Sequence, residues 1–197
     1  MKYPAEVLTR QEVGALLEAC GKEKWTDRRN YALIVLLYRT GLRLAEALDL
    51  RPCDIDTDRG AIRVLRGKGG RARTVGIDPV GLQELFQWRV EHSTRGHTVG
   101  DPLFITGSGQ VLAQGYWRRR LPELGRLAGI YKRVHSHGLR HTHASELRSE
   151  GIDVAVIKRQ LGHVSLITTI QYLDHLGQDS IIKAIASRSV SSFSHAN

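Results

Sequence analysis

Cysteine is scarce in this sequence, and Cys20 and Cys53 are the only two among its 197 residues. Two thiols cannot build a disulfide framework, and these two form no Cys-x-x-Cys pair for zinc or redox chemistry. Cys20 falls on the apolar spacing of a predicted helix, so we expect it to pack in the core. The cysteine content therefore indicates a protein of a reducing compartment.

Long apolar runs are also missing. The longest, residues 32–37, is far shorter than the ~20 residues that a membrane-spanning helix requires. Residues 1–6 lack the apolar segment of a secretory signal peptide. We therefore expect a soluble, cytoplasmic protein.

Two cofactor motifs are absent as well. The sequence has no Gly-x-x-x-x-Gly-Lys-Ser/Thr loop to hold nucleotide phosphates, and no cluster of Asp and Glu able to hold paired Mg²⁺ ions. We therefore expect no cofactor and no metal.

Histidine is locally abundant, and this raises one alternative. His135, His137, His141 and His143 lie within nine residues, and His137 and His141 have the i, i+4 spacing of zinc ligands on a helix. The glutamate of a His-Glu-x-x-His motif is missing, no cysteine lies nearby, and Arg140 would repel a cation. These features disfavour a zinc site.

Positive charge is the clearest compositional feature. The sequence holds 29 Lys and Arg against 20 Asp and Glu, a formal net charge of +9 at pH 7. So basic a domain usually meets a polyanion, most often nucleic acid, although excess arginine can also simply solvate a surface. Because 41% of the residues are hydrophobic and 25% charged, the chain can bury a core, which excludes disorder of the whole chain.

The patterning predicts an α+β fold that is mainly helical. Thr9-Arg10-Gln11-Glu12 has the form of a capping box, and it opens a helix that Gly21 ends. A helix over residues 27–39 is apolar nearly all round, which places it in the middle of the fold. Residues 61–65 and 71–77 alternate like strands around a glycine-rich turn, which predicts a small antiparallel β-hairpin.

The rest of the sequence predicts further helices joined by loops. After Pro79 we expect an amphipathic helix with Leu82, Leu85, Phe86 and Val90 on one face. Residues 91–100 are polar and are predicted to form a surface loop. The other expected helices cover residues 42–50, the segment up to 128, and residues 137–150, 153–161, 165–173 and 180–188.

Five segments carry residues suited to phosphoryl chemistry, and each is ordinary when taken alone. His137 and Arg140, for example, share a helix face at i, i+3 spacing, which is common by chance. In chain order the segments are Thr40-Gly41-Leu42-Arg43-Leu44-Ala45-Glu46, Gly67-Lys68-Gly69, His137-Gly138-Leu139-Arg140, Leu161-Gly162-His163 and Tyr172.

Taken together and in order, these segments resemble the tyrosine recombinase family of phage integrases and Xer-like recombinases. The resemblance runs from Leu8 to Tyr172 and includes the phrases Thr-Gly-Leu-Arg-x-x-Glu, His-x-Leu-Arg-His and Leu-Gly-His-x-Ser. It implies the family's catalytic-domain fold, with the catalytic lysine on the hairpin, and a site-specific DNA recombinase that needs neither ATP nor metal. The implied catalytic residues are Arg43, Lys68, His137, Arg140, His163 and Tyr172.

Phosphodiester chemistry explains why these residue types occur together. In-line attack spreads negative charge over the non-bridging oxygens, which the forked guanidinium groups of Arg43 and Arg140 can hold. The resemblance makes Tyr172 the nucleophile, which forms a 3′-phosphotyrosyl link and frees a 5′-hydroxyl. A phenol with a pKa of ~10 needs a base or adjacent cations, so His137 would accept its proton or hold the phosphate.

Three other residues have supporting roles by the same resemblance. Lys68 would protonate the departing 5′-oxygen, and His163 would bond a phosphate oxygen. Glu46 would orient His137 or an arginine.

Arginines around these segments are the expected DNA contacts, mostly to phosphates. A solvated helix face is the alternative for the three that follow Trp117. The candidates are Arg66, Arg71, Arg73, Arg118, Arg119 and Arg120.

The resemblance also implies an assembly. The partner would be double-stranded DNA, on which four copies would pair two sites and cut one strand of each at a time through a Holliday junction. Residues 178–188 would dock into a neighbouring subunit, and the domain alone could be monomeric. A type IB topoisomerase-like relaxing activity and a non-catalytic DNA-binding relative are the alternative functions. The second is disfavoured because all six catalytic-type residues are present.

The N-terminal length departs from the family pattern. Only eight residues precede Thr9, where most members carry a helical core-binding domain. We therefore expect residues 1–197 to be a single catalytic domain without that module, either cut from a longer protein or naturally short. Residues 189–197 are expected to be a flexible tail.

Overall fold

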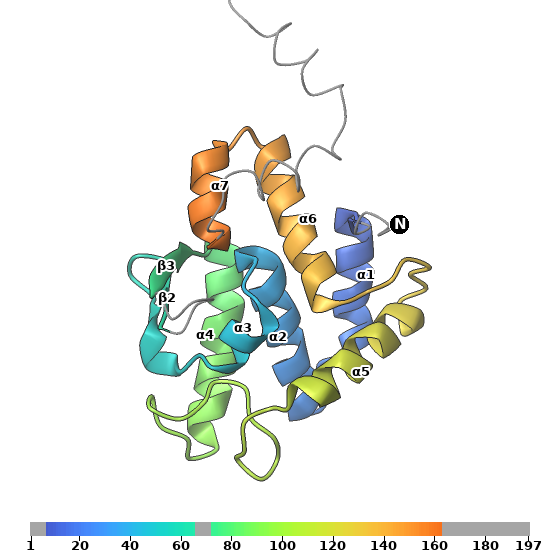
Figure 1. Ribbon diagram of the computed structural model, residues 1–197. Helices are drawn as coiled ribbons and strands as arrows, with labels where there is room; N and C mark the ends of the chain where they lie inside the picture. Colours follow the sequence, from blue (N-terminus) through green and yellow to red (C-terminus); the bar gives the residue numbers. More distant parts are fainter. Residues whose placement is uncertain (1–6, 66–71, 163–197) are drawn as a thin grey trace, which may run out of the picture.

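The computed structural model describes residues 7–65 and 72–162, which fold as a mainly helical α+β domain with one small sheet (Figure 1). This confirms the predicted fold class. The predicted helices over residues 165–173 and 180–188, the 67–70 turn and the 189–197 tail lie outside the described residues. The helices are α1 (Arg10–Cys20), α2 (Trp25–Thr40), α3 (Leu44–Leu48), α4 (Pro79–Thr94), α5 (Gln114–Leu127), α6 (Ser136–Ser149) and α7 (Val154–Leu161).

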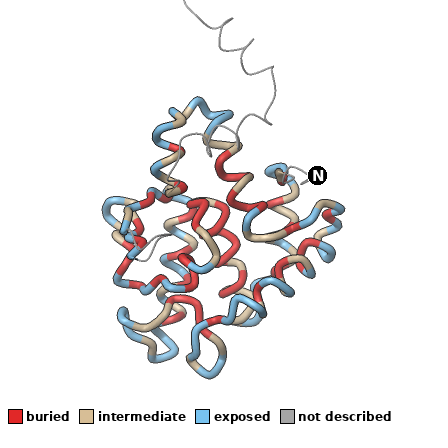
Figure 2. Tube along the Cα trace, viewed as in Figure 1, coloured by how far each residue is buried: buried red, intermediate tan, exposed pale blue. Residues whose placement is uncertain are grey.

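Helix α2 is the centre of the core, as its all-round apolar sequence predicts. It packs against α1, α4 and α6, and Figure 1 shows α1 and α5 on one side of it and the sheet on the other. Residues 32–38 are all buried. In Figure 2 the buried trace accordingly runs through the middle helices and the exposed trace along the outer loops.

Helix α1 begins and ends where its capping signals predict. The Thr9 hydroxyl accepts a hydrogen bond from the Glu12 backbone N–H at 3.1 Å, and the Glu12 carboxylate accepts one from the Thr9 N–H at 2.7 Å. This reciprocal pair satisfies two otherwise unpaired donors of the first turn. Cys20 is buried in the core, as expected, and the helix stops at Gly21.

The predicted hairpin forms, with one additional strand. Strands β2 (Ala61–Val64) and β3 (Arg73–Gly76) are antiparallel, with Ile62 opposite Val75. Both of these side chains are buried, so the hairpin turns one apolar face to the core. The added strand β1 (Ile55–Asp56) pairs with the other edge of β2.

Helix α4 departs from its predicted length and face. It runs to Thr94, so the predicted loop over residues 91–100 begins four residues too early. Phe86 and Val90 are 52% and 48% exposed, whereas Trp88 and His92 are buried beside Leu85. The reason is aromatic packing: Trp88 stacks between two other rings, those of Trp25 and Phe104. These contacts leave Phe86 and Val90 outside, whereas Leu82 still packs against the core.

The C-terminal ends of α2 and α7 meet beside the sheet. α2 ends at Gly41 and α7 at Gly162, both in the left-handed conformation that glycine adopts without strain. Gln160 links α7 to α2 and to strand β3. Its amide nitrogen donates to the Thr40 carbonyl at 3.1 Å and to the Gly76 carbonyl at 2.8 Å. The two helix ends and strand β3 therefore form one corner of the fold.

Candidate active site

Arg140 lies at this corner, on α6 and only 2% exposed. Its Nη1 donates to the Gly41 carbonyl and its Nη2 to the Leu161 carbonyl, both at 2.6 Å. Carbonyls at a helix C-terminus have no intrahelical donor and carry the negative end of the helix dipole. Two helix ends therefore orient one guanidinium through neutral acceptors.

Gly41 makes this approach possible. A Cβ at this position would lie 2.8 Å from the ring of His143 and 2.8 Å from the side chain of Leu161, and its φ is +64°. Any larger residue would be strained and would push the end of α2 away from α7. The Thr-Gly-Leu-Arg phrase thus places a glycine where the two helix ends touch.

The position of Arg43 is fixed by hydrogen bonds to Glu46 of the helix that it begins, α3. It is the N-cap residue of α3, and its backbone N–H donates to Glu46 Oε2 at 3.0 Å while its Nη1 donates to Glu46 Oε1 at 2.9 Å. Its Nη2 reaches the Gly162 carbonyl at 3.4 Å, so Arg43 also contacts the end of α7. Of the two roles expected for Glu46, the structure gives it an arginine as its partner.

Arg73, which the sequence predicts as a DNA contact, is bonded within the chain to Glu46. Its Nη1 and Nη2 donate to the two oxygens of Glu46 at 2.8 Å each, and its side chain is 14% exposed. Burial alone would raise the pKa of Glu46, but the hydrogen bonds from Arg73 and Arg43 lower it to about 2. Glu46 is therefore ionised throughout the physiological pH range.

His137 lies in the first turn of α6, on the same face as Arg140. The centroids of the His137 and His141 rings are 4.5 Å apart, and the rings meet edge to face. Partial burial lowers the pKa of His137, and the positive charges of Arg140 and Arg43 lower it further. The imidazole is accordingly neutral at pH 7, the form that can accept a proton.

His135, two residues before His137, caps the N-terminus of α6. Its Nδ1 accepts from the Gly138 backbone N–H at 2.8 Å, so His135 is the N-cap of α6. Burial and the nearby Arg133 lower its pKa. A neutral ring whose Nδ1 is free of a proton is what this cap requires.

Arg43 and Arg140 line one pocket of about 310 Å³, together with His137. Arg118 and Arg133 line it too, so its wall is strongly basic. Sequence reasoning missed Arg133, and the only signal was a cation two residues before His135, the first histidine of the cluster. The full lining is Leu42, Arg43, Leu44, Arg118, Arg133, His135, Ser136, His137 and Arg140.

The other predicted site residues are placed as follows. Arg119 is exposed on α5, and Arg120 forms an ion pair with Glu123 at 3.0 Å. Arg118 is exposed and its Nη2 donates to the Gln114 side chain. Five predicted residues lie outside the described ranges: Arg66, Lys68, Arg71, His163 and Tyr172.

The histidine cluster does not form a metal centre within residues 7–65 and 72–162. No group of three or more His, Cys, Asp or Glu there could hold a metal ion. His135 caps a helix and His143 is buried against Gly41, whereas the rings of His137 and His141 contact each other edge to face. None of the helices in the described ranges is both long and apolar enough to cross a membrane.

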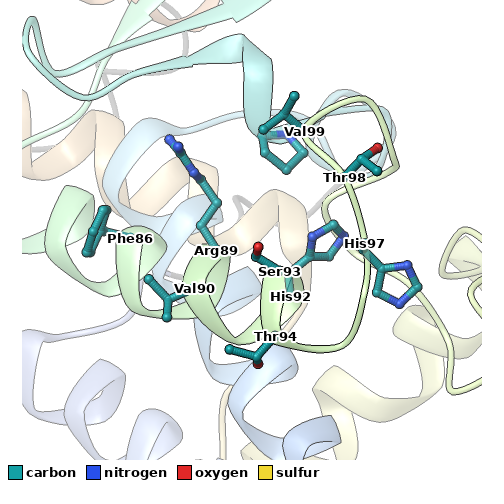
Figure 3. Close-up of a pocket in the computed structure, with 10 residues that line it drawn as sticks. Phe86, Arg89, Val90, His92, Ser93, Thr94, His97, Thr98 and Val99 are labelled. Carbon is teal, nitrogen blue, oxygen red and sulfur yellow. The ribbon is translucent and has the colours of Figure 1, made fainter.

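A larger cavity of about 380 Å³ lies elsewhere, between the C-terminal half of α4 and the loop that follows it (Figure 3). Phe86, Val90 and Val99 give it an apolar rim, and Arg89 is its cation. It shares no lining residue with the arginine pocket. Size alone therefore does not mark the site.

Comparison with known proteins agrees with the resemblance seen in the sequence. The Phage integrase family matches residues 6–178, and the chain belongs to this family. Tyrosine recombinase XerC of Thermodesulfovibrio yellowstonii is 34% identical over 170 residues, which cover 84% of this chain and 56% of that protein. The chain thus spans about half the length of this relative.

Solved structures give the same result. The crystal structure of XerA recombinase matches with a TM-score of 0.79 and 28% identity, over 96% of this chain and 66% of that one. The XerH site-specific recombinase bound to palindromic difH substrate, a post-cleavage complex, matches with a TM-score of 0.76 and 27% identity, over 94% of this chain and 54% of that one. The fold is that of these recombinases.

Proposed function

We propose that the chain is the catalytic domain of a tyrosine-type site-specific recombinase, which cleaves and rejoins double-stranded DNA through a 3′-phosphotyrosyl intermediate. One observation carries the proposal: Arg43 and Arg140, which come from separate elements, line the same basic pocket beside His137. Two forked cations facing one pocket suit the non-bridging oxygens of a phosphodiester. The XerH relative bound to its difH substrate supports DNA as the ligand.

The cleavage step assigns a task to each group. The phenol oxygen of Tyr172 bonds to phosphorus, the bond from phosphorus to the 5′-oxygen breaks, and the two events are in line. His137 takes the phenol proton, or holds the phosphate, and Lys68 gives a proton to the departing 5′-oxygen. Arg43, Arg140 and His163 hold the charged oxygens. The reverse attack by a 5′-hydroxyl restores the phosphodiester, so joining needs no external energy source.

Contacts to the flanking DNA come from the arginines around the pocket. Arg118 and Arg133 line it, and Arg119 is exposed on the same helix as Arg118. We assign these contacts to phosphates, which give affinity more than sequence choice. We also infer a homo-tetramer on two paired DNA sites and a cytoplasmic location.

A nicked suicide substrate tests this function. Cleavage of such a DNA releases a short fragment that cannot return, so the covalent protein–DNA product accumulates. We expect a denaturation-resistant adduct with the natural chain and none with Tyr172→Phe, which keeps the ring and removes the nucleophile. An adduct of undiminished yield with Tyr172→Phe would contradict the assignment. If religation restores only the original strand and never exchanges partners, the relaxing activity of a type IB topoisomerase is the correct function.

A further inference from the structure

Arg73 stands out among the residues around the pocket because both ends of its fork are engaged by one buried carboxylate. Glu46 has a side chain only 3% exposed, and each of its oxygens accepts one Arg73 bond at 2.8 Å. Two parallel bonds fix the relative orientation of the two groups, which a single contact does not. Arg73 is therefore held firmly, and it faces into the fold.

The same carboxylate also holds Arg43. Oε1 accepts from Arg43 Nη1 and Oε2 from the Arg43 backbone N–H, in addition to the two Arg73 bonds. A carboxylate has about four lone-pair sites, so these bonds saturate it. Any movement of Arg73 must then shift Glu46, and with it the guanidinium of Arg43.

Gly162 completes the arrangement from the other side. A Cβ at Gly162 would lie 2.6 Å from Arg73 Nε, so the glycine backbone packs directly against the Arg73 guanidinium. The carbonyl of the same glycine accepts from Arg43 Nη2. Arg73 Nε is buried and has no hydrogen-bond partner among the described residues. An unsatisfied buried donor is a cost, which the bidentate contact to Glu46 offsets.

Hydrogen bonds between α7 and strand β3 hold the strand that carries Arg73 in place. Gln160, in the last turn of α7, exchanges two hydrogen bonds with the backbone of Gly76 in β3, at 2.8 and 2.9 Å. Strand β3 is thereby fastened to α7 three residues after Arg73. The Glu46 carboxylate thus joins strand β3 to the start of α3. The end of α7 is joined to both by Gln160 and by the Gly162 carbonyl.

We infer that Arg73 is a positioning residue of the recombination reaction: it holds Glu46, and through Glu46 the guanidinium of Arg43, in the orientation that meets the scissile phosphate. This inference rests on the proposed function, and it replaces the DNA contact that the sequence predicts for Arg73. Arg73 touches no reacting atom. Its effect on cleavage passes through Arg43.

A double-mutant cycle on the full chain tests this coupling. Arg73→Lys keeps the positive charge and loses the fork, and Arg43→Lys does the same at the phosphate. We measure the single-turnover rate of adduct formation on the nicked substrate, with saturating protein. Since misplacing a catalytic group by about 1 Å costs ~100-fold, we expect Arg73→Lys to slow cleavage by roughly 10- to 100-fold. In the Arg43→Lys background the same change should cost less than about 3-fold.

Controls separate the inference from its alternatives. Arg63→Lys, on the neighbouring strand β2, loses one surface bond to the Cys53 carbonyl and should leave the rate unchanged. Full multiplication of the two effects would overturn the inference. So would an Arg73→Lys variant that binds DNA more weakly with a salt dependence reduced by about one ion, the signature of a phosphate contact. If the natural chain forms no adduct, the proposed function fails instead.

A second variant guards against loss of folding. If Arg73→Lys melts more than a few degrees below the natural chain, Glu46→Gln takes its place in the cycle, because it keeps the shape of the side chain and removes the charge that holds both arginines. The inference again requires that its effect on the cleavage rate disappear in the Arg43→Lys background. An effect that persists there would contradict it.

Discussion

His143 shows how strongly single residues at this corner are constrained. It follows Arg140 by one turn of α6 and is 7% exposed, and its Nε2 has no hydrogen-bond partner within the described ranges. Burial lowers its pKa to about 4, and the positive charge of Arg140 contributes. A neutral ring here avoids a third positive charge beside Arg140 and Arg43.

This burial predicts an acid-sensitive stability. The unfolded chain binds a proton at His143 below its ordinary pKa of 6.5, whereas the folded chain binds it only near 4. Stability is therefore fully present above 6.5 and falls as the pH drops from 6.5 to 4, by about 3 kcal/mol from this residue. Urea unfolding at pH 7 and at pH 4.5 should show a clearly smaller loss in His143→Leu than in the natural chain. Parallel losses in the two proteins would show that His143 is not buried in neutral form.

The sequence identifies Arg43, Arg140 and Glu46 because their residue types and order match a family pattern. The structure bonds Glu46 to Arg43 and places Arg43 and Arg140 in the lining of one pocket. The sequence does not identify the role that we infer for Arg73. That role depends on three segments that are far apart in the chain and meet only in the fold, at Glu46, Arg73 and Gly162. A basic residue near a lysine-bearing turn is read from sequence as a DNA contact, since nothing local indicates a buried carboxylate.

At the scale of elements, the helix ends decide the geometry of the site. The carbonyls that orient Arg140 belong to the ends of α2 and α7, and a glycine in the left-handed conformation closes each of these helices. Helix ends are readable from sequence when they carry capping residues, as at Thr9 and Gly21. The contact between two such ends is a tertiary event, and no local signal predicts it.

Replacing Gly41 by alanine tests the importance of that contact. Gly41→Ala adds a Cβ 2.8 Å from His143 and Leu161 in a left-handed backbone, so we expect a loss of about 3 kcal/mol in unfolding free energy. Gly129→Ala is the matched control, because Gly129 has a similar φ of +69° and open space around it. The control should lose only about 1 kcal/mol, measured by urea unfolding. Equal losses in both variants would mean that the two helix ends do not press on each other.

Helix α4 shows the limit of reading faces from apolar spacing. Phe86 and Val90 fit an amphipathic pattern, yet they lie outside, and they rim the cavity of Figure 3. The stacking of Trp88 with Trp25 and Phe104 fixes which side turns inward. Both partners are remote from Trp88 in sequence, so the correct face follows only from the assembled core.

On the scale of the whole molecule, the fold gathers several of the chain's many arginines around one pocket. Glu46 compensates part of the positive charge of Arg43 and Arg73, while Arg118 and Arg133 keep the pocket wall basic. The net charge of +9 predicts an anionic partner without locating it. The fold class and the family follow from the sequence, whereas the particular cations that share one pocket follow only from the structure.

We propose that Arg43 and Arg140, which line one pocket, neutralise the same phosphate, and a substrate without that charge tests this most directly. A nicked DNA with a methylphosphonate in place of the scissile phosphate lacks one charged oxygen. Removing one group that stabilises a transition-state oxyanion costs roughly 100- to 1,000-fold, so Arg43→Ala should slow adduct formation by this factor on normal DNA. On the neutral substrate the loss should shrink to less than about 10-fold relative to the natural chain. An equal loss on both substrates would show that Arg43 does not act on the charge of the phosphate, and would contradict the account.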